Sequence, residues 1–183
     1  MAFSVGPVGA LSDKLKIGSW HRVGEAVNYQ KGSWTKSGFQ LSPSSTSSLP
    51  TNSAEKFKLP ELFQRLDAIK VASGEIFIAS DDYRSQLRET TSADAVDMNL
   101  FGLIAVCADH RLALTCWRIA SDKADDNASE DFRKFVSSYD GAGGKATAEL
   151  IANLPANPNS PTSYPNLNRS EEHTSELQSL EEI

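Results

Sequence analysis

Short apolar blocks alternate with amphipathic stretches along most of the chain. Residues 112–119 (LALTCWRI) are almost continuously apolar, which predicts a strand buried on both faces. Similar apolar blocks predict further strands over residues 2–8, 20–29, 32–41, 71–79 and 93–98. Apolar side chains at helical spacing predict helices that begin at Pro60, at Asp81 as the N-cap, at Asn99, at Ser129 or Glu130, and at Lys145. Strands that alternate with helices in this way predict an α/β fold.

The segments outside this pattern divide the chain into one domain and two C-terminal pieces. Residues 1–154 form the predicted domain, in which the Ser/Thr/Pro-rich residues 42–53 predict a flexible surface loop. Residues 155–168 are rich in Pro and Asn and are expected to leave the domain. The chain also opens abruptly on an apolar block, from which we expect that the first strands of the domain are missing.

The origin of residues 169–183 has two interpretations. Residues 169–179 (RSEEHTSELQS) resemble the translation of a short-read sequencing adapter, so we treat residues 169–183 as a non-native tail. The other interpretation is a natural acidic tail that favours helix. The whole chain holds 18 basic and 24 acidic residues, a net charge of −6. The tail contributes one Arg and five Glu, which leaves 17 basic and 19 acidic residues and a net charge of −2 elsewhere.

Composition and charge favour a soluble, cytoplasmic protein. The chain is 39% hydrophobic and 23% charged, as globular proteins are, and no signal peptide is visible. Its negative charge argues against nucleic acid and anionic membranes as partners, and no apolar run approaches the ~20 residues of a membrane helix. Cys107 and Cys116 lie inside apolar runs, which predicts buried thiols in a reducing compartment. The histidines His21, His110 and His173 are far apart in sequence, so no metal site is predicted.

Three polar segments mark the candidate chemistry, because each follows a predicted buried strand. They are Ser73-Gly-Glu-Ile-Phe77, Val96-Asp-Met-Asn99 and Arg118-Ile-Ala-Ser-Asp122. Ligands of open α/β sheets bind where the strands end. We therefore expect Phe77, Met98, Asn99 and Asp122 to converge on one pocket.

In this order and at this spacing, the three segments resemble the nucleoside phosphorylase/nucleosidase superfamily. The most similar branch is the methylthioadenosine/S-adenosylhomocysteine nucleosidases, whose motifs read Gly-Asp-x-Phe, Val-Asp/Glu-Met-Glu and Arg-x-x-Ser-Asp. Upstream, residues 6–9 and 15–18 resemble the family's glycine turn and its Leu-Lys-x-Gly-Asp segment. The resemblance covers residues 2–154. It implies a three-layer α/β/α fold with a mixed central sheet flanked by helices, here without its first strands.

The resemblance also implies a role for each site residue. Asp122 would protonate N7 of a purine as the N-glycosidic bond breaks, and Ser121 would orient that carboxyl. Phe77 would stack on the base, and the backbone of Ile78 would hydrogen-bond the edge of the base. Met98 would pack under the ribose. Asn99 stands where the family has a Glu that grips the ribose hydroxyls, and an amide supports neither those bonds nor a developing positive charge as well.

Most of these residues also have a simpler structural interpretation. Asp122 is a candidate cap in a polar loop, and Phe77 and Met98 are candidates for the core. Asn99 fits a turn at the end of a strand. Arg118 is expected to form a structural ion pair, with Asp97 or Glu75 as its partner, and Asp97 is also a candidate cap for the helix that follows it.

Two functional hypotheses remain open. The first is an enzyme that cleaves the N-glycosidic bond of a purine nucleoside or a related nucleotide. It needs no cofactor, and the choice between hydrolysis and phosphorolysis, with phosphate as co-substrate, stays open because the first strands would carry those groups. The second is a nucleoside- or nucleotide-sensing module of a larger signalling or defence protein, with weak or no turnover. In either case the resemblance makes a homo-oligomer possible, and we expect the present chain to be inactive alone.

Overall fold

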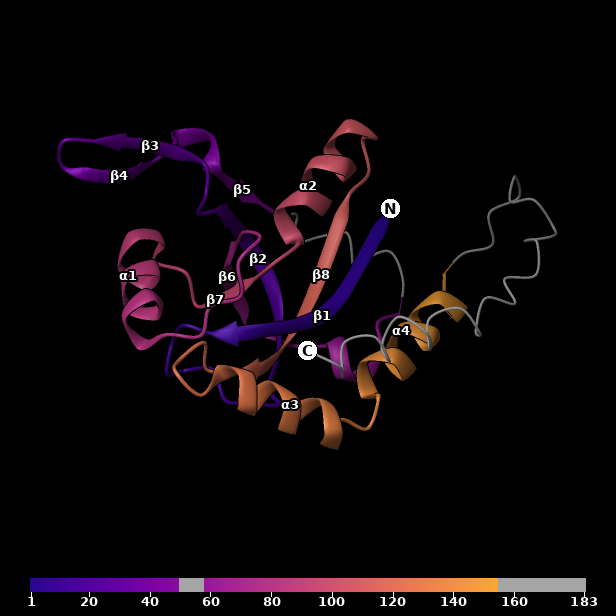
Figure 1. Ribbon diagram of the computed structural model, residues 1–183. Helices are drawn as coiled ribbons and strands as arrows, with labels where there is room; N and C mark the ends of the chain where they lie inside the picture. The colour runs from indigo at the N-terminus through magenta and orange to yellow at the C-terminus, as the bar shows by residue number, and fades with distance from the viewer. Residues whose placement is uncertain (50–57, 155–183) are drawn as a thin grey trace, which may run out of the picture.

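The computed structural model describes residues 1–49 and 58–154 (Figure 1). The predicted segments 155–168 and 169–183, and part of the predicted loop 42–53, lie outside the described residues. The elements are, in chain order, β1 (Ala2–Ala10), β2 (Trp20–Asn28), β3 (Gly32–Thr35), β4 (Gly38–Leu41), the 3₁₀ turn η1 (Pro43–Ser45), β5 (Thr46–Ser48), the 3₁₀ turn η3 (Glu61–Phe63), β6 (Ala68–Ser73), α1 (Asp81–Thr91), β7 (Ala95–Asp97), α2 (Leu100–Asp109), β8 (Leu114–Asp122), α3 (Ala128–Ser138) and α4 (Ala142–Ala152).

Six strands form one mixed sheet in the order β5-β2-β6-β7-β1-β8. The pairs β2–β6, β6–β7 and β1–β8 are parallel, whereas β1–β7, β2–β5 and β2–β8 are antiparallel. The β2–β8 pairing joins the two halves of this row, so that β2, β6, β7, β1 and β8 close into a ring. The mixed central sheet predicted from the sequence is confirmed, and its closure is a feature that the sequence did not predict.

Strand β2 closes the ring because it changes partner along its length. Residues 20–22 pair with β8, and residues 22–28 pair with β6. The register with β6 shifts between Val23 and Glu25, which makes Gly24 the extra residue of a bulge, and a bulge bends its strand. A Cβ atom at Gly24 would lie 3.3 Å from the Cβ atom of Ala68, so any side chain there would crowd β6.

The main core lies against α2. All five strands of the ring contribute side chains to it, among them Ala26, Val71, Ala95 and Cys116, and α2 adds Leu100. Cys107 and Cys116 are free, buried thiols, as the sequence predicted. Figure 1 shows α2 on one side of β1 and β8, with α3 and α4 on the other. Helices on both sides of a mixed sheet confirm the predicted three-layer arrangement.

The opposite side of β8 holds an aromatic core. The Trp117 ring stacks on Phe63 of η3 with 4.4 Å between ring centroids and 13° between ring planes. Ala146 and Leu150 of α4 complete this cluster. None of the helices within residues 1–49 and 58–154 has the length and apolar character needed to cross a membrane.

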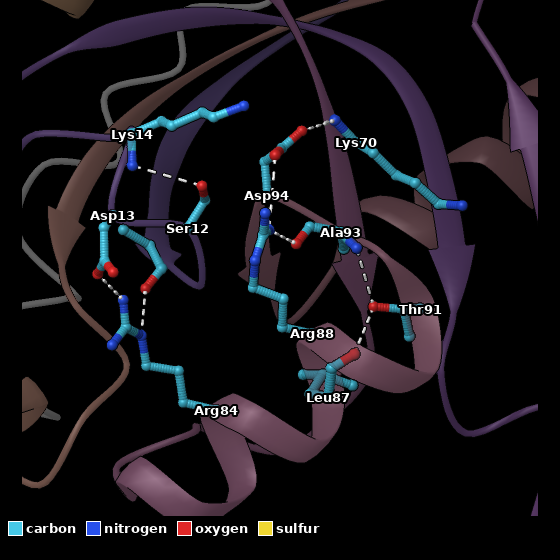
Figure 2. Close-up of polar contacts among 11 residues, drawn as sticks. Ser12, Asp13, Lys14, Lys70, Arg84, Leu87, Arg88, Thr91, Ala93 and Asp94 are labelled. Carbon is cyan, nitrogen blue, oxygen red and sulfur yellow. Dashed lines mark hydrogen bonds and ion pairs between the residues drawn. The ribbon is translucent and has the colours of Figure 1, made fainter.

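Helix α1 is tied to the end of β1 by a network of side chains, which Figure 2 shows. The Arg84 guanidinium donates from Nε to the Ala10 carbonyl oxygen at 3.2 Å and from Nη2 to Asp13 Oδ1 at 2.6 Å. One turn later, Arg88 Nη1 donates to the Ala93 carbonyl oxygen at 2.6 Å. The Asp94 backbone carbonyl accepts the amides of residues 11 and 12. These bonds fix the end of β1, which borders the candidate site described below.

The helix predicted from Pro60 is wrong. Only the 3₁₀ turn Glu61–Phe63 forms, and Arg65 then adopts a left-handed backbone conformation with φ of 54°. The chain continues into β6, so Ile69 lies in a strand. The apolar spacing that suggested one helix comes from two elements, because Phe63 packs on Trp117 while Ile69 packs in the main core.

Other predicted boundaries also move. The strand predicted over residues 71–79 is wrong beyond Ser73, because the chain turns at Gly74, whose amide donates to the Asp97 carbonyl oxygen. The strand predicted over residues 32–41 is the β3–β4 hairpin, which projects from the body of the protein in Figure 1. The described part of the predicted loop 42–53 contains η1 and β5, because β5 pairs with β2.

Helix ends differ from the prediction by a few residues. Ser80 rather than Asp81 caps α1, with its Oγ accepting from the Tyr83 amide, and α1 continues to Thr91. Helix α4 begins at Ala142, before the predicted Lys145. The predicted helix from Asn99 and the predicted helix near Ser129 are present as α2 and α3.

We predict that Leu150→Ala lowers the free energy of unfolding by roughly 2–5 kcal/mol, because a fully buried side chain is removed from the aromatic core. The neighbouring Ile151 is 60% exposed, so Ile151→Ala should change this free energy by no more than about 0.5 kcal/mol. Urea unfolding followed by circular dichroism measures both variants. Equal losses would contradict the packing of α4 described above.

Candidate active site

A cleft of about 320 Å³ opens beside the end of β8. Its lining consists of residues 4–9, Phe77, Val96, Asp97, Met98, Asn99, Arg118, Ser121, Asp122 and Phe132. The predicted convergence of Phe77, Met98, Asn99 and Asp122 is therefore confirmed. Ile78 is not among the lining residues, and its side chain packs partly buried against the cluster that contains Val27. The role expected of its backbone stays a prediction.

A second hollow, of about 570 Å³, lies between α3 and the start of β2. It is larger than the cleft, and it contains none of the predicted site residues Phe77, Ile78, Met98, Asn99, Ser121 and Asp122. Its charged Lys134 is exposed and paired with Glu130 on the same helix. Since the buried polar groups lie in the smaller cleft, we place the candidate site there.

Asp122 is one of two buried carboxyl groups in the cleft, with only 2% of its surface exposed. Its Oδ2 accepts from Ser121 Oγ at 2.8 Å, and its Oδ1 accepts from the Ala124 amide at 2.9 Å. Burial raises the pKa of Asp122 above its usual range, and these two hydrogen bonds oppose part of that rise. The carboxyl group therefore holds its proton to a higher pH than an exposed Asp does.

A bulge in β8 allows the consecutive residues Ser121 and Asp122 both to line the cleft. Val8 lies opposite Ala120 and Gly9 lies opposite Asp122, so Ser121 is an extra residue in the pairing with β1. The expectation that Asp122 lies in a polar loop is wrong, because Ser121 and Asp122 still belong to β8. Ser121 Oγ also lies 3.2 Å from the Val8 carbonyl oxygen.

The backbone of β1 supplies the space that Asp122 occupies. A Cβ atom at Gly9 would lie 2.9 Å from Asp122 Oδ1 and 3.1 Å from the Ala124 Cβ atom. Both distances are shorter than ordinary contacts, so this approach requires glycine. The glycine turn expected at residues 6–9 is wrong, because β1 continues through them to Ala10. The signal for its place in the cleft was the pair of glycines, Gly6 and Gly9, inside an apolar block.

A buried ion pair forms the floor of the cleft. Arg118 Nη2 lies 3.1 Å from Asp97 Oδ2, and the two side chains are 2% and 4% exposed. Arg118 Nη1 also donates to Ser4 Oγ at 3.0 Å. The other oxygen of Asp97 accepts from the Leu100 amide at 3.2 Å and so caps α2. The structural ion pair expected for Arg118 is confirmed with Asp97 as its partner, and so is the capping role expected of Asp97.

The rim of the cleft is apolar and open. Phe77 is 42% exposed and Met98 is 49% exposed, so the interpretation of these two residues as core is wrong. The rings of Phe77 and Phe132 pack edge to face, with 6.3 Å between their centroids and 68° between their planes. Phe132 was not among the predicted site residues, and its closeness in sequence to Asp122 was the available signal. Asn99 is exposed at the start of α2.

The described residues contain no metal centre. In residues 1–49 and 58–154, no group of three or more His, Cys, Asp or Glu side chains is placed to hold a metal ion. The cleft itself contains a buried acid, a hydroxyl group, an amide, a buried ion pair and exposed apolar side chains.

We predict that Arg118→Met lowers the free energy of unfolding by roughly 3–5 kcal/mol, because the Asp97 carboxylate remains buried without its cation. The double variant Arg118→Met with Asp97→Asn removes both charges, so its loss should be smaller than the sum of the two single losses. Urea unfolding of the four proteins gives this coupling. Strictly additive losses would show that the two charges do not stabilise each other.

We predict that Asp122→Asn raises the melting temperature at neutral pH. Because burial raises the pKa of folded Asp122 above 3.8, the folded state binds this proton more tightly than the unfolded state. Wild-type stability therefore falls as pH rises from about 4 through the raised pKa. Asn cannot ionise, so its advantage should be present above that window and disappear near pH 4. Melting temperatures from pH 4 to 8 measure it, and a difference independent of pH would contradict the raised pKa.

Comparison with curated proteins finds a relative that is a nucleosidase. The chain is 34% identical over 76 residues to the aminodeoxyfutalosine nucleosidase of Campylobacter jejuni, which is 42% of this chain and 33% of that protein. The match therefore spans about a third of the length of this curated relative.

Two solved structures from Helicobacter pylori share the fold. Futalosine hydrolase superimposes with a TM-score of 0.65 and 20% identity over 83% of this chain and 67% of its own. The 5′-methylthioadenosine/S-adenosylhomocysteine nucleosidase superimposes with a TM-score of 0.66 and 21% identity over 83% of this chain and 68% of its own. The sequence model of the Phosphorylase superfamily matches residues 2–152, which confirms the resemblance found from the three motifs. This chain belongs to the Phosphorylase superfamily.

Proposed function

We propose that this chain carries the base-binding and acid-bearing part of an enzyme that cleaves the N-glycosidic bond of a purine nucleoside or a related nucleotide. The observation that carries the proposal is the Asp122 carboxyl, which is buried, has a raised pKa and faces a cleft with an exposed aromatic rim. Membership of the superfamily supports it. A variant of the similar Helicobacter pylori nucleosidase was solved with 5′-methylthioadenosine in its active site, which supports a nucleoside as the ligand class.

Asp122 is the proposed general acid. A purine that leaves the sugar gains negative charge, and protonation at N7 by Asp122 removes that charge, an effect worth about 10²–10⁴ in rate. The raised pKa of Asp122 suits this task because the carboxyl group must keep its proton until the bond breaks.

Ser121 is the proposed orienting group, and its hydroxyl can serve both states of Asp122. While Asp122 is protonated, its Oδ2 hydroxyl points to N7 of the base, and Ser121 donates to the Val8 carbonyl oxygen. When the proton moves to the base, Ser121 turns its hydrogen toward Oδ2 and stabilises the new carboxylate. The distances of 2.8 Å to Oδ2 and 3.2 Å to the Val8 oxygen permit both arrangements.

The rim residues are assigned to the substrate. Phe77 meets Phe132 at a steep angle, which leaves ring surface free to stack on a base. Met98 is proposed to pack under the ribose, the backbone of Ile78 to bond the base edge, and Asn99 to bond the sugar hydroxyls. Phosphate as a co-substrate, a homo-oligomeric assembly and a cytoplasmic location remain part of the proposal, and no resident cofactor is included.

The second candidate function is a nucleoside- or nucleotide-sensing module with weak or no turnover. Asn99 favours it, because a neutral amide at the cleft rim cannot stabilise the positive charge that develops on the sugar. Binding without cleavage would be the signature of this function.

We predict that the purified chain binds adenine and adenosine, and that any base release falls by about 10²–10⁴ in Asp122→Asn, since Asn has no acidic proton. Calorimetry measures binding. Chromatography measures base release from adenosine, methylthioadenosine, inosine and ATP, with and without phosphate. Asp109→Asn, an exposed acid outside the cleft lining, is the matched control and should leave release unchanged. Release that is lost in Asp122→Asn would support the enzyme, and neither binding nor release would contradict both functions.

A further inference from the structure

The segment from Gly74 to Ser80 carries Phe77 to the cleft without forming a helix or strand of its own. We call it the Phe77 loop. Two of its apolar side chains face solvent, with Ile76 56% exposed and Phe77 42% exposed. Because neither a helix nor a sheet fixes these residues, contacts with other parts of the chain must determine where Phe77 lies.

The first of these contacts comes from Tyr29, in the turn between β2 and β3. Its hydroxyl donates to the Ile76 carbonyl oxygen at 3.2 Å, across 47 residues of sequence. Its ring fills the space beside Gly74, where an added Cβ atom would lie only 2.3 Å from Tyr29 Cζ. The ring also packs on the buried cluster of Val27 and Ala72. Tyr29 thus joins the Phe77 loop to the core.

The second contact comes from Gln30 in the same turn. Its Oε1 accepts from the Glu75 amide at 2.9 Å. The Gln30 backbone is itself held, since its amide donates to Asn28 Oδ1 at 3.0 Å. Two consecutive residues therefore bind two backbone groups of the Phe77 loop, one carbonyl and one amide.

The other side of the Phe77 loop contacts the segment that follows Asp122. Phe77 meets Phe132 of α3, and the Asp81 amide donates to Asp126 Oδ1 at 3.2 Å. The loop therefore spans the distance between the β2–β3 turn on one side and the start of α3 on the other. A shift of the turn would change the separation between Phe77 and Asp122.

We infer that Tyr29 and Gln30 are positioning residues that hold the Phe77 loop at its working distance from Asp122. The β3–β4 hairpin continues directly from this turn and projects from the body of the protein (Figure 1). Displacement of the hairpin would therefore reach the cleft through the same two contacts. The effect on nucleoside binding rests on the proposed function, whereas the effect on the loop does not.

Hydrogen exchange of the free protein tests the effect on the loop. Gln30→Ala removes the acceptor of the Glu75 amide, and Tyr29→Phe removes only the hydroxyl that binds Ile76 while its ring stays beside Gly74. Exchange over residues 74–80 should accelerate by about tenfold in Gln30→Ala and by a smaller factor in Tyr29→Phe, with melting temperatures unchanged. Gln30→Glu keeps an acceptor at the same length and should restore the slow exchange. The controls are Gln40→Ala, at an exposed position of β4, and Tyr83→Phe, which removes an exposed hydroxyl from α1 and keeps the Tyr83 amide bonded to Ser80.

Calorimetry with adenine as the probe tests the effect on the cleft. Each of Tyr29→Phe and Gln30→Ala should weaken adenine binding by about three- to tenfold, and Gln30→Glu should restore it. Unchanged exchange over residues 74–80 in both variants would overturn the positioning role, whatever adenine does. If wild-type protein binds no adenine, the proposed function fails, and the exchange experiment still decides the positioning role.

Discussion

The Arg118–Asp97 ion pair lies where β7, β1 and β8 meet, and water reaches almost none of either side chain. One carboxylate oxygen of Asp97 binds the guanidinium, and the other caps α2 through the Leu100 amide. Arg118 adds a bond to Ser4 of β1. Because an unpaired charge in such a place is costly, these bonds fix the relative positions of three strands and one helix. The cleft is built directly on this arrangement.

Two buried carboxyl groups in the cleft thus have different surroundings. Asp97 faces a guanidinium and serves the structure. Among the described residues, the hydrogen-bond partners of Asp122 are a hydroxyl and an amide, which are neutral. Burial without a cation raises the pKa of Asp122, and a carboxyl group that keeps its proton is what acid catalysis requires. The contrast explains why two carboxyl groups close together can have separate roles.

The superfamily relationship accounts for the fold at low sequence identity. The Helicobacter pylori structures are about one-fifth identical to this chain and still superimpose over 83% of it. In this chain the geometry at the strand ends includes the bulge at Ser121 and the space beside Gly9. Asn99 is the residue of the cleft that departs from the family motif, and for that reason it bears most directly on which function the cleft has.

The sequence by itself predicted four of the residues that meet in the cleft. Phe77, Met98 and Asn99 follow the parallel strands β6 and β7, and Asp122 ends β8, which lies next to β7 through Gly9 of β1. The continuous apolar run of β8 likewise predicted a strand buried on both faces. These features depend on periodicity and on order along the chain, which a single sequence displays.

Only the tertiary structure decided the contacts between distant residues. The β2–β8 pairing closes the ring, and the apolar residues after Pro60 divide between a turn and a strand because they pack on different cores. Phe132 and Tyr29 reach the site from a helix and a turn that the three motifs do not include. Local spacing records which face of an element is apolar. It does not record which partner that face meets, because the partner is chosen by packing across the whole chain.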